Sequence, residues 1–296
     1  MKEDKVKLND YRAEIMLDED YQPTQVQTSL DELLDYLLNE MTVLERASIQ
    51  RKMPKQLDKR QLIKAILTTR PAGSVTEELV EMVDGMLQNE IMSKTITSHE
   101  RLPREDSSYP GVPIISVWNG DIATLKIDAI VNAANSQMEG CFVPFHNCID
   151  NVIHNAAGIQ LREDCSKIMH MQGHIEDTAD AKLTRAYNLP SKYVIHTVGP
   201  IVSGKMLTNQ DKEALEKTYE ACLNLVKESG LIKSIAFCSI STGVFGFPFE
   251  PAAKIALKTV AKWLEENPDC IDHVVFNTFG DEATRIYKTL INDWKE

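Results

Sequence analysis

The spacing of hydrophobic positions changes near residue 100 and divides the chain into two parts. Before that point, apolar residues recur at helical spacing from Ser29, a candidate helix N-cap, to about residue 94. The predicted helices cover 30–41, 44–53, 57–67 and 75–92, a small bundle of about four. Residues 1–28 are polar and aperiodic, which predicts an extended arm, and the stretch 98–113, rich in Pro, Ser and charge, predicts a connector.

Beyond residue 100, apolar and β-branched runs alternate with helical patterns. The predicted strands are Ile114–Trp118, Ala129–Asn132, Tyr193–Thr197, Ile235–Ser239 and Val274–Thr278. The predicted helices are Cys148–Ala157, Ile159–Met171, Asn209–Lys227, Pro251–Glu266 and Asp281–Trp294. This alternation predicts an α/β domain over 101–296 with three α/β/α layers and a mixed, mostly parallel sheet, preceded by a small all-α region within 1–100. In such sheets ligands bind beyond the carboxyl ends of the strands.

Composition narrows the class of protein. The chain has 296 residues and a net charge of −12, and a net acidic chain disfavours nonspecific binding to nucleic acid. No apolar run approaches the roughly 18–20 residues of a membrane span, and the N-terminus MKEDKVKLND does not have the pattern of a signal peptide. Six cysteines are scattered along the chain, as suits a reducing compartment. We expect a soluble cytoplasmic protein without a nucleic-acid or membrane partner.

Three residues with the chemistry of zinc ligands lie within eight positions after the second predicted strand. Cys141, His146 and Cys148 form the pattern C-x4-H-x-C at the start of a predicted helix. Thiolate and imidazole are preferred zinc ligands, and three protein ligands leave a fourth position open for water or substrate, as in catalytic sites. Asp150 is a candidate fourth ligand, which would instead make the site structural. The alternative without a metal is that both cysteines are ordinary thiols and His146 is a loop residue.

A second loop, STGVFG at 241–246, follows the fourth predicted strand. Its two glycines let the backbone approach a ligand, and successive N–H groups there can bind an anion ahead of the next helix. The loop is neither a Walker loop nor a dinucleotide fingerprint. The alternative is a tight strand-to-helix turn that binds no ligand.

Together these motifs resemble the macrodomain family, which binds ADP-ribose. The matching stretches, between about residues 112 and 294, are Gly120-Asp121-Ile122, 131–136 (VNAANS), 149–154 (IDNVIH), Ala157-Gly158, 187–190 (YNLP), 193–200 (YVIHTVGP) and 241–246. Where ordinary members carry a glycine-rich run, this chain has Gly140-Cys141 and His146-Asn147-Cys148. In this it is similar to the zinc-dependent branch of bacterial protein-ADP-ribose hydrolases, which also have an N-terminal helical extension. The chain departs from the family pattern at Ala179 and Ala186, where relatives often have glycine.

The resemblance implies roles for individual residues. Asp121 would accept the adenine amine and Phe279 would stack on the adenine, although a turn residue and a core residue are the respective alternatives. Ile122 and the loop of Ser241, Thr242, Gly243, Val244, Phe245 and Gly246 would hold the diphosphate. Asn135 would bind the distal ribose, and Asn132 would do the same or fix the loop backbone. Asp150 would orient a water molecule or take its proton.

The function implied is a hydrolase that removes ADP-ribose from mono-ADP-ribosylated protein side chains and holds one Zn²⁺ per chain. A protein modified by a sirtuin-type ADP-ribosyltransferase is the substrate that the resemblance suggests. The alternative is a non-catalytic module that binds ADP-ribose and holds a structural zinc. Residues 1–100 have no candidate site, so we expect them to pack against the catalytic domain or to contact the protein substrate.

Overall fold

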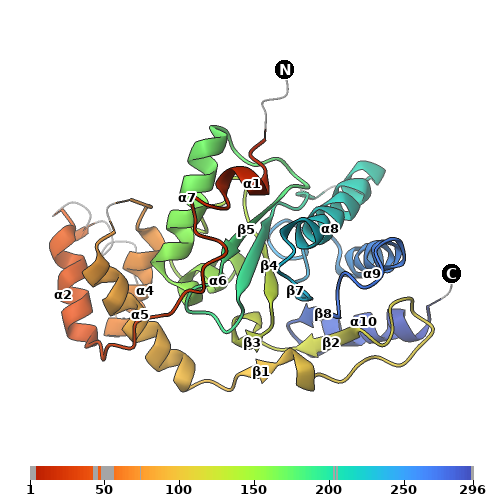
Figure 1. Cartoon of the computed structure of the whole chain (residues 1–296), viewed down its shortest axis with the longest axis horizontal. Coiled ribbons are helices and arrows are strands. Elements are labelled where there is room, and N and C mark those ends of the chain that lie inside the picture. Colours follow the sequence, from red (N-terminus) through yellow and green to blue (C-terminus); the bar gives the residue numbers. More distant parts are fainter. Residues whose placement is uncertain are drawn as a thin grey trace.

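A six-stranded mixed sheet forms the centre of the molecule (Figure 1). The computed structural model describes residues 5–42, 46–47, 57–73, 75–202, 204 and 206–294. The strands of the sheet are β2 (Ile115–Asn119), β4 (Ala129–Ala133), β5 (Ala181–Arg185), β6 (Tyr193–Thr197), β7 (Ser234–Phe237) and β8 (His273–Thr278). Their order is β2-β8-β7-β4-β6-β5, and all neighbours are parallel except β5, which runs antiparallel to β6.

Helices cover both faces of this sheet. One layer consists of α6 (Ile149–Ala157) and α7 (Ile159–Gln172), which contact β4 and β5. The other consists of α8 (Asn209–Ser229), α9 (Phe249–Glu266) and α10 (Asp281–Asn292). The predicted three-layer α/β fold is confirmed. The prediction missed β5, the antiparallel edge strand, because its sequence AKLTR has only one large apolar residue.

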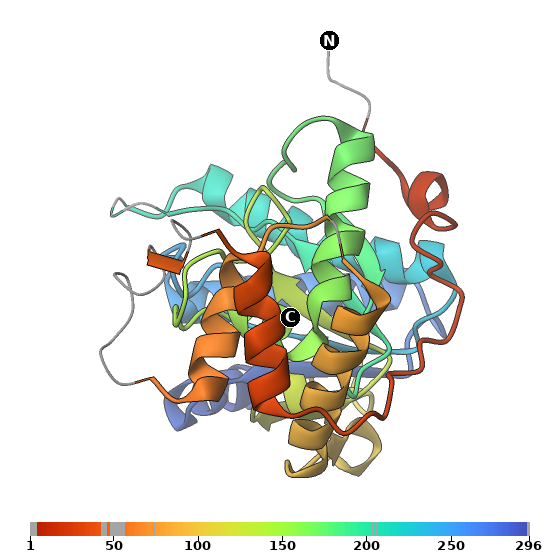
Figure 2. The ribbon, with the colours of Figure 1, turned by 90° about the vertical axis from the view of Figure 1, so that its left-hand side faces the viewer.

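Three described helices of the N-terminal part build a second apolar cluster. They are α2 (Leu30–Glu40), α4 (Lys59–Thr69) and α5 (Glu77–Met92), capped by Ser29, Asp58 and Thr76. Their buried leucines, isoleucines and valines pack together with Ile159 of α7, so this helical region lies against α6 and α7 (Figure 2). The helix predicted over 44–53 falls on a stretch of which the structure describes only residues 46–47.

The N-terminal arm is part of the main core, and the prediction of a polar, extended arm is wrong for residues 8–18. It contains a short helix, α1 (Leu8–Tyr11), and buries Leu8, Tyr11, Ile15 and Leu17 in the apolar cluster of the sheet. The Leu183 amide of β5 donates to the Tyr11 hydroxyl at 2.9 Å, so the arm covers the edge of the sheet that β5 would leave open. Leu8, Tyr11 and Ile15 fall at helical spacing, but three positions were too few to predict a helix.

Two short strands, β1 (Thr97–Ser98) and β3 (Leu125–Lys126), pair in parallel and tie the connector to the main domain. Two 3-10 helices, η1 (His99–Arg101) and η2 (Ile122–Thr124), lie in the connector and after β2. Among the described residues, no helix combines the length and the apolar character needed to cross a bilayer.

Candidate functional site

A cleft of about 380 Å³ opens at the carboxyl ends of β4, β7 and β8. Parallel strands place their carboxyl ends at one edge of the sheet, so the loops that follow them meet there. The predicted site residues that line it are Asn135, Cys141, His146, Cys148, Asp150, Ser241, Thr242, Gly243, Val244, Phe245 and Phe279. Four others, Asp121, Ile122, Asn132 and Gly246, lie outside this lining.

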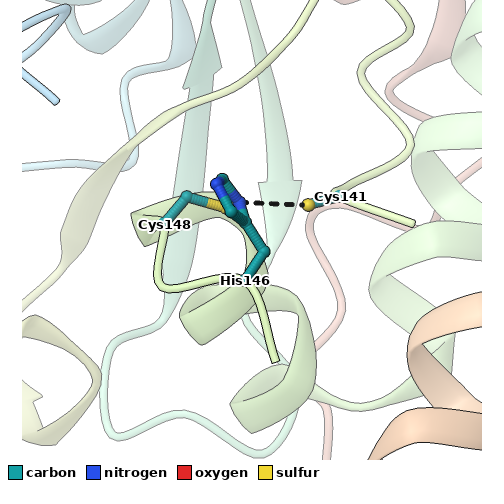
Figure 3. A group of neighbouring side chains, drawn as sticks. All are labelled: Cys141, His146 and Cys148. Carbon is teal, nitrogen blue, oxygen red and sulfur yellow. Dashed lines mark hydrogen bonds between the residues drawn. The ribbon is translucent and has the colours of Figure 1, made fainter. Parts of the chain in front are cut away.

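The three candidate metal ligands converge in the loop before α6 (Figure 3). Cys141 Sγ lies 3.6 Å from His146 Nδ1, and one ligand atom from each of Cys141, His146 and Cys148 lies within 4.8 Å of the other two. In a tetrahedral zinc site, bonds of about 2.3 Å to sulfur and about 2.0–2.1 Å to nitrogen put these two ligand atoms about 3.6 Å apart. The donor set and its spacing therefore fit a zinc ion.

Cys148 is held in place by the start of α6. It is the N-cap residue, and its sulfur accepts a hydrogen bond from the Asn151 amide at 3.4 Å. Burial and the neighbouring Cys141 raise the pKa of Cys148 to about 11, although the Asn151 amide lowers it in part. The free thiol is therefore protonated at neutral pH, and a bound cation would favour its thiolate.

Asp150 lies deeper in the cleft, on the first turn of α6. Its two oxygens accept hydrogen bonds from Asn132 Nδ2 at 2.7 Å and from Asn135 Nδ2 at 3.4 Å. Burial raises the pKa of this carboxyl group to about 6, whereas the Asn132 hydrogen bond and the positive charge of Arg162 lower it. Among the described residues, the group of converging metal ligands has three members, and Asp150 is not one of them.

Asn132 lies behind Asp150 rather than in the cleft wall. Its side chain is fully buried on β4, and its amide nitrogen also lies 3.1 Å from Nδ1 of His196 on β6. His154, one turn along α6 from Asp150, approaches the carboxylate at 3.5 Å. In this position Asn132 orients Asp150, and of these two predicted asparagines only Asn135 lines the cleft.

The loop at 241–246 presents unpaired backbone donors to the cleft. Within the described chain, the amides of Gly243, Val244 and Phe245 have no acceptor, whereas the Gly246 amide donates to the Gly243 carbonyl at 3.0 Å. Positive φ angles at Ser241 (64°) and Gly246 (70°) give the loop this compact form. Three successive free N–H groups suit the oxygens of an anion.

Asp121, Ile122 and Phe279 lie together beyond the neighbouring strands β2 and β8, whose last residues pair as Asn119 and Thr278. One Asp121 oxygen accepts the Ala123 amide at 3.0 Å and starts η2, as expected of a turn residue, but its second oxygen has no donor among the described residues. Ile122 is 2% exposed and its amide has no acceptor in the same part of the chain. Phe279 is 87% exposed, which excludes core packing and leaves its ring free to stack.

Sequence reasoning missed Asn277, which lines the cleft from β8. Its Nδ2 donates to the Gly120 carbonyl at 2.9 Å and fixes the turn that carries Asp121. An asparagine inside the otherwise apolar strand Val274–Thr278 is a signal that could have identified it, because a buried amide needs partners.

Comparisons with known proteins agree with this architecture. A family model described as "Macro domain" matches residues 131–256. A protein of Treponema medium named "Protein-ADP-ribose hydrolase" is 45% identical over 88% of this chain and 97% of its own, and one of the same name from Staphylococcus aureus strain MRSA252 is 42% identical over 88% and 95%. The crystal structure of a Trypanosoma brucei macrodomain in complex with ADP-ribose matches with a TM-score of 0.61 and 28% identity, over 77% of this chain and 95% of that one.

Proposed function

The chain belongs to the macrodomain family, and on this basis we propose that it binds ADP-ribose in the cleft and hydrolytically removes it from mono-ADP-ribosylated protein side chains, with the help of a zinc ion. One observation carries the proposal. Three ligands suited to zinc converge in the wall of a cleft that the buried Asp150 and the loop residues 241–245 also line. The names of relatives 42–45% identical support the same activity.

The two ends of the cleft would bind different parts of ADP-ribose. Phe279 and the free oxygen of Asp121 would receive the adenine, and the free amides of 243–245 would receive the diphosphate. The distal ribose would then lie toward Asn135 and the metal loop. Asn135 is fixed there because its Nδ2 also donates to the Gly140 carbonyl at 3.0 Å.

Hydrolysis breaks the bond between the anomeric carbon of this ribose and a side-chain heteroatom, and water supplies the new oxygen. Zinc bound to the three ligands would supply a Lewis acid beside the ribose, which polarises substrate oxygen or bound water. Asp150 would orient the attacking water or accept its proton, and Asn132 holds its carboxylate in position. A substrate modified by a sirtuin-type ADP-ribosyltransferase stays a prediction from the family resemblance.

The alternative is a binding module with a structural zinc. A structural site normally supplies four protein ligands. Here the candidate fourth ligand, Asp150, is engaged by two asparagine amides instead, which favours an open fourth position and the enzyme.

The test is hydrolysis of a mono-ADP-ribosylated protein with and without a zinc chelator, combined with Cys148→Ala. We expect chelation to remove the zinc and abolish turnover. Cys148→Ala should have the same effect, because the zinc loses one of its three protein ligands. Calorimetric affinity for free ADP-ribose should change little, since the adenine and diphosphate contacts lie elsewhere. Cys270→Ala, a free cysteine of similar intermediate exposure outside the cleft, is the matched control. Normal turnover in metal-free Cys148→Ala would exclude the zinc mechanism, and ADP-ribose binding without turnover by the wild type would indicate the binding module.

A further inference from the structure

The end of α4 in the helical region is connected to the metal loop by two hydrogen-bonded relays. The first relay runs through Arg162 of α7, a side chain that is 7% exposed. Its Nη1 donates to the carbonyls of Leu67, at 2.9 Å, and Arg70, where α4 ends. Its Nε donates to the Glu139 carbonyl at 2.8 Å, and its guanidinium lies 4.5 Å from the centre of the Phe142 ring. Glu139 and Phe142 flank Gly140-Cys141, so Arg162 holds the chain on both sides of the first ligand.

The second relay runs through two asparagines of α6. The Thr68 hydroxyl of α4 donates to Asn155 Oδ1 at 3.2 Å, and Asn155 Nδ2 donates to Asn151 Oδ1 at 2.7 Å. Asn151 Nδ2 in turn donates to the carbonyls of His146, at 2.9 Å, and Val143, at 3.3 Å. This relay therefore holds the part of the loop that carries the second ligand.

We infer that α4 fixes the geometry of the metal loop through Arg162 and through Thr68–Asn155–Asn151, so that the helical region preorganises Cys141 and His146 for the metal. A loop that is already ordered loses less conformational entropy when it binds a ligand, so its affinity is higher. Partners outside the ligand set commonly orient metal ligands in this way. Arg162 and Thr68 are positioning residues, since both act on the ligands through the loop backbone. This inference rests on the proposed zinc site.

The experiment measures zinc affinity by competition with a chelator in Arg162→Lys and Thr68→Val. Lysine keeps the charge of Arg162 but has no planar fork to reach three carbonyls, and valine keeps the shape of Thr68 but removes its hydroxyl. We expect zinc to bind at least about tenfold more weakly to Arg162→Lys and about threefold more weakly to Thr68→Val. The two losses should add in the double variant, because the relays hold different parts of the loop.

Two matched controls separate positioning from general destabilisation. Arg185→Lys changes another arginine that is 7% exposed, and Thr259→Val removes a buried helical hydroxyl in α9, far from the cleft. Both should keep zinc affinity within about twofold of the wild type. In the Co²⁺-substituted protein, the thiolate-to-metal absorption band should weaken in Arg162→Lys and Thr68→Val and not in the controls.

A readout without metal keeps this inference separable from the proposed function. In zinc-free protein, amide hydrogen exchange over residues 139–146 should be faster in Arg162→Lys and Thr68→Val than in the wild type. Unchanged exchange and unchanged zinc affinity in the folded variants would overturn the inference while leaving the zinc site intact. If Arg162→Lys does not fold, the zinc affinity and amide exchange of Thr68→Val alone test the inference. A wild type that binds no zinc would overturn the proposed metal, and the inference with it.

Discussion

The two glycines of the loop at 241–246 differ in what a side chain would do there. Gly243 lines the cleft, and a Cβ there would meet no atom within 4 Å. Its backbone is not in the left-handed region, so there is room for a side chain. A Cβ on Gly246 would lie 2.7 Å from the Val202 carbonyl oxygen, at a φ of 70°. The first position therefore has open space beside it, and the turn requires glycine at the second.

We expect Gly243→Val to weaken ADP-ribose binding by at least about 3 kcal/mol, roughly a hundredfold, because the new side chain occupies the space of the diphosphate. Its melting temperature should stay close to that of the wild type. Gly246→Val should instead lower the melting temperature, because valine is strained at a positive φ and its Cβ would clash with the Val202 carbonyl oxygen. Calorimetry and thermal unfolding measure the two effects, and a Gly243→Val variant with wild-type affinity would remove this loop from the binding site.

Ala179 is an alanine at a position that suits glycine. Its φ is 71°, in the left-handed region. A left-handed conformation costs an L-residue about 1–2 kcal/mol, and the added flexibility of glycine offsets about 0.5–1 kcal/mol of that. Ala179→Gly should therefore raise the free energy of unfolding by about 0.5–1 kcal/mol in urea titration. Ala181→Gly, in the extended strand β5, is the control and should lower it; a loss in both would contradict the argument.

Sequence reasoning identified the candidate site residues whose functional partners lie close to them in the chain. Cys141, His146 and Cys148 are close in sequence, so a single loop brings them together. Arg162 was not identified, because its partners Leu67 and Glu139 come from distant segments and are backbone carbonyls, which have no side-chain signature.

Among the elements, β6 places a histidine in the centre of the protein. His196 is fully buried, and burial lowers its pKa to about 3. Its Nε2 lies 3.0 Å from the Thr184 hydroxyl of β5, and its Nδ1 lies near Asn132 of β4, so the neutral imidazole links three strands. In the unfolded chain the same group titrates near pH 6.5.

This difference predicts an acid-sensitive stability. The folded-state pKa lies below the unfolded value, so the contribution of His196 is fully present above about pH 6.5 and is lost progressively as the pH falls toward 3. Between pH 7.5 and pH 5 the loss amounts to about 2 kcal/mol. Urea unfolding at both pH values measures the free energy of unfolding. Its fall from pH 7.5 to pH 5 should be smaller in His196→Gln than in the wild type, by about that amount. Asp164, whose pKa burial raises to about 6, titrates in the opposite sense but equally in both proteins. An identical fall in the two proteins would contradict the prediction.

The elements themselves were predictable where the hydrophobic pattern was long. The helices α6 to α10 and five strands follow from it to within a few residues, because each buries a continuous apolar face. The strand β5 and the helix α1 could not be predicted this way. The strand β5 has only one large apolar residue and α1 is only four residues long. Contacts between distant segments, as between Tyr11 and Leu183, stabilise both.

For the whole molecule, the sequence predicted a helical region and an α/β domain but not how they join. The carboxyl group of Asp84, on α5, is completely buried at the junction. Its oxygens accept from Tyr21 and Thr24 of the arm, and from Gln160 (3.0 Å) and Asn188 (2.7 Å) of the main domain. One side chain thus connects the arm, the helical region and the main domain.

Replacing Asp84 with asparagine should therefore destabilise the junction. The new NH₂ group would face donors that now have a carboxylate oxygen as their acceptor. Losing a hydrogen bond to a charged group costs about 1.5–3 kcal/mol. We expect Asp84→Asn to lower the free energy of unfolding in urea by at least about that amount, whereas Asp35→Asn on the exposed face of α2 should have almost no effect. Because the helical region has its own apolar cluster, amide exchange should accelerate more in α2, α4 and α5 than in α8 and α9. Equal acceleration in all five helices would mean that the protein opens only as a single unit, and that Asp84 does not hold a separable helical region in place.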